Sequence, residues 1–227
     1  MIIAIAAAVA AAQPAPCPDG LTAKAFVCRA AEANAKSDPQ AAAQAFEKAA
    51  QAVDSSTPEA SRLWAAAGNM WIAAGEPGKA ALALDRGLAG TGLRAEQRGE
   101  ALLDRARAAE AQNDLTTARA KATEAAQTIS SDPFLWYFSA ALAIREGDAA
   151  TAKSSIARAL TLAPSDPVIL FEAGHVAHFA GDLPGARSYW TQASAADPKG
   201  DAGKAAREAL AMLDKPAAVQ SEAAEAR

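Results

Sequence analysis

Residues 64–87 read WAAAGNMWIAAGEPGKAALALDRG, and the order of large and small residues in this stretch decides the fold. Trp64 and Gly68 lie four residues apart, and Ala80 and Leu84 have the same spacing after a break at Gly75. Alanines equivalent to Ala80 recur at spacings of 38, 38, 34 and 34 residues: Ala42, Ala80, Ala118, Ala152 and Ala186. A period near 34 residues predicts an array of paired helices.

Each repeat carries the same kinds of residue at fixed distances from its alanine. Four residues after the alanine come Phe46, Leu84, Ala122, Ile156 and Trp190. Twelve residues before it lies a small residue: Ala30, Gly68, Ala106, Ala140 and Gly174. Four residues earlier still lie Phe26, Trp64, Leu102, Trp136 and Leu170. Small residues let helices cross closely and large ones fill the spaces between layers, so this pattern favours stacked helix pairs.

Turn and capping residues divide the chain into helices. Gly75, Asn113, Gly147 and Gly181 each stand five residues before the repeated alanine and tolerate the left-handed backbone that ends a helix. Asp-Pro at 132–133 and 166–167 suits the first residues of a helix. We expect helices at 21–36, 39–53, 59–74, 77–89, 95–111, 115–129, 133–145, 149–162, 167–179, 183–196 and 201–213.

These repeats resemble the tetratricopeptide repeat (TPR) family, whose pattern is W-x2-L-G-x2-Y, then A-x3-F, then A and P. The second, fourth and fifth repeats follow it well, and the first and third follow it less closely. The residues that match are Trp64, Gly68, Trp71, Ala80 and Leu84; Trp136, Ala140, Ala152, Ile156, Ala159 and Pro164; and Gly174, Ala186, Trp190, Ala193 and Pro198. The resemblance covers residues 21–198 and implies an all-α, right-handed superhelix of about five helix pairs. A capping helix over 199–214 and a disordered tail over 215–227 complete the expected organisation.

The resemblance also implies that the first helix of each pair lines a concave groove for a peptide or helix of another protein. The binding residues that it implies are Asn69, Phe134, Tyr137, Ile144, Phe171, His175 and His178. A charged middle of the groove would come from Glu100, Arg107 and Glu110, with Arg107 paired to Glu110 one turn on. The aromatic residues have an alternative interpretation, because the final helix or a second copy of the chain would bury them equally well.

The sequence offers little for chemistry. His175, His178 and Asp182 share one helix face at a spacing that zinc accepts, but Asp182 is explained by helix capping, so we expect no metal. The four tryptophans stand at packing positions rather than in a carbohydrate site. Charges such as Asp104, Arg105, Glu146 and Asp148 are expected to be solvated. Phosphate-loop, nucleophile-elbow and dinucleotide motifs are missing, so we expect no cofactor and no enzyme.

The N-terminus suggests export. Residues 1–12, MIIAIAAAVAAA, are uncharged, too short to cross a bilayer core of about 30 Å, and end in small residues, as a secretory signal peptide does. We expect a disordered lead-in over 13–20 that contains Cys17, and the other cysteine of the chain is Cys28. In an exported protein such a pair favours a disulfide. The alternative is a cytosolic protein that keeps its apolar N-terminus and two free thiols.

Composition limits the partners. The 227 residues are 51% apolar but only 5% aromatic, with a net charge of −4 and no basic block. Nucleic acid and stable membrane insertion are therefore disfavoured. The expected function is a non-catalytic protein- or peptide-binding scaffold of the periplasm, monomeric or dimeric. Two alternatives stay open: a cytosolic TPR scaffold, and a structural protein whose groove is filled by a second copy.

Overall fold

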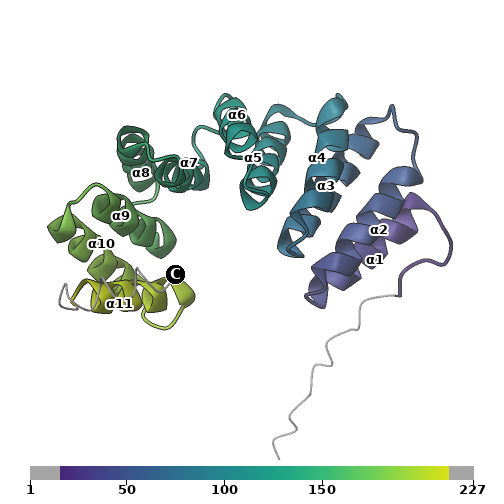
Figure 1. Cartoon of the computed structure of the whole chain (residues 1–227). Helices are drawn as coiled ribbons and strands as arrows, with labels where there is room; N and C mark the ends of the chain where they lie inside the picture. The colour runs from purple at the N-terminus through teal and green to yellow at the C-terminus, as the bar shows by residue number, and fades with distance from the viewer. Residues whose placement is uncertain (1–15, 215–227) are drawn as a thin grey trace, which may run out of the picture.

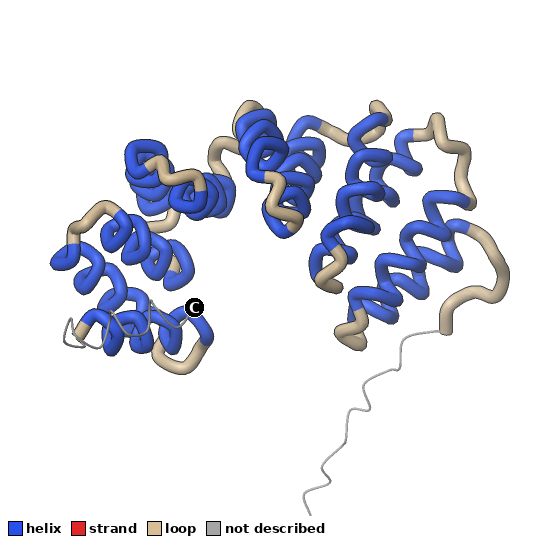
Figure 2. Tube along the Cα trace, in the orientation of Figure 1, coloured by secondary structure: helices blue, strands red, loops and turns tan. Residues whose placement is uncertain are grey.

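The computed structural model describes residues 16–214, which form eleven α-helices and no strand (Figure 2). The expected signal peptide at 1–12 and tail at 215–227 lie outside the described residues. The helices are α1 (Ala23–Ala35), α2 (Pro39–Gln51), α3 (Pro58–Ala73), α4 (Pro77–Ala89), α5 (Ala95–Ala111), α6 (Leu115–Ala125), α7 (Pro133–Arg145), α8 (Ala149–Leu162), α9 (Pro167–Phe179), α10 (Leu183–Ala196) and α11 (Asp201–Leu213).

The helices form five pairs that follow one another along an open arc, with α1 and α11 at opposite ends (Figure 1). Each pair contacts the next through its second helix, and the first helices also meet directly, α3 with α5 and α7 with α9. Second helices of neighbouring pairs make no comparable contact within residues 16–214. The first helices therefore lie on the inner side of the arc, and α11 packs on α9 and α10 at its end. This is the all-α superhelical array that the period predicts.

Local capping explains where the helices begin and end. Gly75, Asn113, Gly147 and Gly181 all adopt the predicted positive φ, at +71°, +61°, +77° and +78°, and Ser37 takes the same conformation at the equivalent place. The aspartates that follow Ser37, Asn113, Gly147 and Gly181 accept hydrogen bonds from the next helix's first turn, as Asp114 does from the Thr117 amide at 3.0 Å. Turns this short hold the two helices of a pair antiparallel.

The predicted helix bounds differ most from the observed ones at the end of α6. The helix expected over 115–129 ends at Ala125, and residues 126–128 form a tight turn. The turn lets Ile129 bury its side chain against Leu102 and Leu135, where it is 5% exposed. Gly99 of α5 leaves the necessary room, since a Cβ there would lie 2.6 Å from the Ile129 side chain. Packing between layers thus overrides a stretch whose local sequence permits helix.

The layers are thin because alanines form much of the core. The alanines of the repeat pattern, Ala42, Ala80, Ala118, Ala152 and Ala186, are all fully buried. Where the layers need volume, a large residue covers a small one, and Leu84 lies directly over Gly68. Many small contacts between neighbouring pairs, rather than one large core, hold such an array together.

A disulfide fastens the segment that enters the array. Cys17 and Cys28 are bonded at an S–S distance of 2.04 Å, which links the loop before α1 to the middle of that helix. The predicted pairing of the two cysteines agrees with this geometry. Among the described residues, no helix combines the length and the apolar character that crossing a membrane requires.

Candidate functional site

Three hollows lie beside the first helices. The α3–α5 hollow, of about 490 Å³, is lined by Arg62, Ala65, Ala66, Asn69, Leu93, Gln97, Glu100, Ala101, Leu103, Asp104 and Asp132. The α7–α9 hollow, of about 390 Å³, is lined by Ala141, Ile144, Arg145, Glu172, His175, His178 and Phe179. The α9–α11 hollow, of about 400 Å³, is lined by His175, His178, Leu183, Trp190, Ala209, Met212 and Leu213. The first two open on the inner side of the arc, and the two histidines join the second to the third.

Asn69 lines the α3–α5 hollow, but its amide is already engaged. Its Nδ2 donates to Asp104 Oδ2 at 2.7 Å, and the Arg107 guanidinium donates to the other carboxylate oxygen at 3.1 Å. Burial raises the pKa of Asp104, and the two donors offset part of that rise. The expected pair of Arg107 with Glu110 is wrong, because Glu110 pairs instead with Arg145 of α7.

The expectation that scattered charges are simply solvated is wrong for several of them. Besides Asp104, Arg105 donates to Asp85 of α4 at 2.7 Å, and Glu146 pairs with Arg119 of α6. Stacking brings helices of successive pairs close enough for opposite charges to meet, which a single repeat cannot reveal. Asp148 is exposed as expected, and it caps α8 through the Thr151 amide at 3.0 Å.

Phe134 and Tyr137 form an aromatic pair on the first helix α7. Their rings meet edge to face with centroids 6.4 Å apart, and Phe134 is 47% exposed. Tyr137 is half-buried against the core of α7 to α9. Burial, and then the negative charge of Glu172, raise the pKa of Tyr137. The Tyr137 hydroxyl is thus a neutral group at physiological pH, beside an apolar ring that solvent reaches.

Phe171, His175 and His178 gather around Trp190 of α10. The Phe171 and His175 ring centroids lie 4.4 Å apart, and the two imidazoles lie 5.7 and 5.8 Å from the Trp190 ring. Trp190 Nε1 donates to the Phe171 carbonyl oxygen at 3.1 Å. Phe171 is half-buried in a cluster that includes residues of α11. The alternative of burial under the final helix therefore applies partly to Phe171, whereas Phe134 remains open.

Ile144, His175 and His178 line the α7–α9 hollow together, and the structure adds a residue there that the sequence analysis missed. Glu172 is only 6% exposed and lies against His175, with Oε2 3.5 Å from Nδ1. A signal for it exists in the repeats, because Asp104 and Glu172 both stand two residues before the small crossing residue, Ala106 or Gly174.

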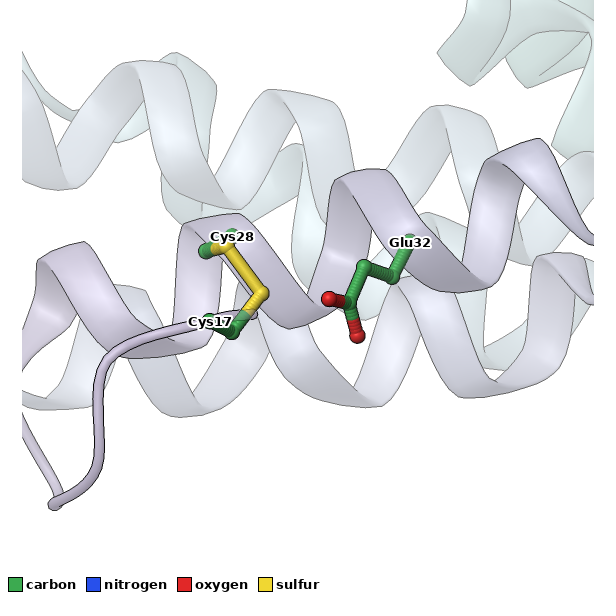
Figure 3. Close-up of side chains that lie close together, drawn as sticks. All are labelled: Cys17, Cys28 and Glu32. Atoms are coloured by element: carbon green, nitrogen blue, oxygen red, sulfur yellow. A yellow bond between two sulfur atoms is a disulfide. The ribbon is translucent and has the colours of Figure 1, made fainter. Parts of the chain in front are cut away.

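The tryptophans serve packing, as expected. Trp71 and Trp190 are buried, while Trp64 and Trp136 are half-buried under arginines at 4.5 and 4.1 Å from the ring centroids. Within residues 16–214 the one group with metal-ligand spacing is Cys17, Cys28 and Glu32, whose sulfurs are bonded to each other (Figure 3). A disulfide supplies no thiolate, so this oxidised cluster is a poor metal site. Asp182 accepts a hydrogen bond from the Gly185 amide at 2.9 Å and caps α10.

The arrangement of an open arc, paired antiparallel helices and small crossing residues is the fold of TPR proteins. PilW, described as a widely conserved type IV pilus biogenesis factor, is similar to the chain with a TM-score of 0.67 and 16% identity over 81% of each chain. PilF of Pseudomonas aeruginosa gives a TM-score of 0.66 and 16% identity, over 83% of this chain and 82% of that one. YrrB, a TPR protein with an unusual peptide-binding site, gives 0.59 and 16%, over 81% and 91%.

No protein-family model matches the sequence, and no curated protein matches it significantly. At 16% identity the structural likeness concerns the fold.

Proposed function

We propose that the chain is a non-catalytic scaffold that binds a peptide or helical segment of another protein along the inner side of its arc. The observation that carries the proposal is the exposed Phe134 ring, which meets Tyr137 edge to face on the first helix α7. Hollows lie between the first helices α3 and α5 and between α7 and α9. Exposed aromatic anchors beside pockets are the usual source of affinity in such grooves. The fold similarity to YrrB, a TPR protein with a peptide-binding site, supports the same assignment.

Phe134→Glu tests the groove. We expect peptides selected on the wild type from a phage-displayed library of random dodecapeptides to lose at least roughly 10-fold in affinity for this variant, because a charge replaces an apolar anchor. Fluorescence anisotropy measures the loss, and circular dichroism should show unchanged helix content because the ring is half in solvent.

The matched control is Leu82→Glu, which places the same charge on α4 at a side chain 66% exposed, beside second helices rather than the inner face. It should leave peptide affinity unchanged. Equal loss in both variants, or no peptide selected on the wild type, would refute the groove.

We further propose that the scaffold works in the cell envelope after export. The apolar run at 1–12 and the Cys17–Cys28 disulfide support this setting, since such bonds persist outside the reducing cytosol. Fold similarity to a type IV pilus biogenesis factor is consistent with it. Mass spectrometry of the protein from its native cells should find a mature N-terminus near Gln13 and an oxidised cysteine pair. An intact N-terminus with two alkylatable thiols would favour the cytosolic alternative.

A further inference from the structure

Glu172 is a largely buried carboxylate whose charged partner is a histidine of its own helix. Its side chain is 8% exposed, and its one ion-pair contact within residues 16–214 is His175 Nδ1 at 3.5 Å, longer than a good hydrogen bond. A buried carboxylate is costly unless charged or strongly polar donors satisfy its oxygens. Glu172 lines the α7–α9 hollow, which has space for such a donor.

Asp104, a second carboxylate at the same repeat position, has a hydrogen-bond donor that Glu172 does not have. Asp104 stands two residues before the small residue of its repeat, as Glu172 does. Each has a partner one turn on in its own helix, Arg107 for Asp104 and His175 for Glu172. Asp104 has in addition the Asn69 amide, which reaches it from the first helix of the preceding pair at 2.7 Å.

The residue equivalent to Asn69 beside Glu172 is Ala141. Asn69 follows the small residue Gly68 directly, and Ala141 follows Ala140 in the same way. Ala141 lines the α7–α9 hollow together with Glu172, so the hollow occupies the place where an amide would stand. Glu172 thus lacks the amide donor from the preceding pair that Asp104 has.

The one arginine that lines the hollow is bonded elsewhere, so it does not neutralise the Glu172 carboxylate. Arg145 lines the hollow, but its guanidinium is engaged by Glu110 and by Asn113 Oδ1, at 2.9 Å for the latter. The remaining lining is apolar or imidazole: Ala141, Ile144, His175, His178 and Phe179. A hollow with apolar and imidazole side chains around one largely buried acid suits a ligand side chain with a long aliphatic stem and a cationic end.

We propose that the α7–α9 hollow binds a lysine or arginine side chain of a bound peptide, with the Glu172 carboxylate as its counter-charge. This specificity pocket rests on the proposed peptide-binding function and states which anchor the peptide presents. The stem packs on Ile144 and Phe179, and the ammonium or guanidinium takes the place that Asn69 fills in the equivalent site.

The test uses full-length protein and the dodecapeptide library described above. Peptides selected on the wild type should carry Lys or Arg at one fixed position. Changing that residue to Met should weaken binding to the wild type by roughly 10-fold or more, because hydrogen bonds to a buried charge are strong. The same change should have little effect on binding to Glu172→Gln, or to Ala141→Asn, which supplies the internal donor.

Glu208→Gln is the matched control, because it removes an exposed carboxylate of α11 that lines none of the three hollows. It should retain the full Lys-to-Met effect. Circular dichroism and thermal unfolding establish that each variant is folded, and Ala141→Asn decides the matter if Glu172→Gln unfolds.

Two results would overturn the inference while leaving the groove in place. One is selection of peptides without a fixed basic residue, and the other is an equal Lys-to-Met effect on the wild type and both variants. Binding that still depends on Phe134 would then uphold the proposed function. Failure to select any peptide on the wild type would overturn both.

Discussion

Gly174→Leu should lower the free energy of unfolding by about 3 kcal/mol or more, because the helix crossing of α9 and α10 has no room for a side chain. A Cβ at Gly174 would lie 2.2 Å from Trp190 Nε1 and 2.3 Å from its Cδ1. The indole cannot swing away at low cost, since it is 4% exposed and donates to the Phe171 carbonyl oxygen. Urea unfolding followed by circular dichroism measures the loss.

Gly78→Ala is the control for this prediction. Gly78 lies in the first turn of α4, and the nearest atom to its added Cβ is Gln112 Oε1 at 3.9 Å, an ordinary contact. The free energy of unfolding of Gly78→Ala should stay within about 0.5 kcal/mol of the wild-type value. If Gly174→Leu unfolded no more easily than Gly78→Ala, the close crossing of α9 and α10 would be wrong.

Trp71→Ala should cost about 3–5 kcal/mol by leaving a large cavity in the second helix pair. Trp71 is 2% exposed and packs in one cluster with Ala43 of α2 and Leu84 of α4. Its Nε1 donates to Glu47 Oε1 of α2 at 2.9 Å, so the ring joins the first and second pairs. Losing it should release α1 and α2 from the rest of the array.

Hydrogen exchange should locate this damage. Stability in a repeat array is shared mainly between neighbours, so amides of α1 to α4 should exchange faster while those of α7 to α10 change little. Trp71→Phe keeps most of the ring volume and loses the hydrogen bond, and should cost only about 1 kcal/mol. Uniform loss of protection along the whole chain would contradict an array of separable layers.

The helix ends were predictable because local residues specify them. Asn113 and Gly147 take positive φ values and the next aspartates cap the following helices, using interactions that span only a few residues. The end of α6 was not predictable in the same way. Residues 126–129 permit helix, and the turn there depends on the space that Gly99, nearly a full repeat away in the sequence, leaves for Ile129.

In the candidate site, the helix that carries each residue was predictable, but the polar partner of each residue was not. The repeat pattern placed Phe134, Ile144 and His175 on first helices, and they lie on α7 and α9. The repeat pattern did not predict that Asn69 donates to Asp104 or that Arg145 pairs with Glu110, because each interaction joins two successive repeats. Within one helix, Arg107 and Glu110 looked like natural partners.

The sequence by itself determined the repeat and most of the helix boundaries, since these follow from periodicity and from contacts within a few residues. Only the tertiary structure decided which polar groups are satisfied. Glu172 has His175 of its own helix but no amide partner from the neighbouring first helix, because Ala141 offers no polar side chain there. The two residues lie beside one hollow only once the pairs are stacked.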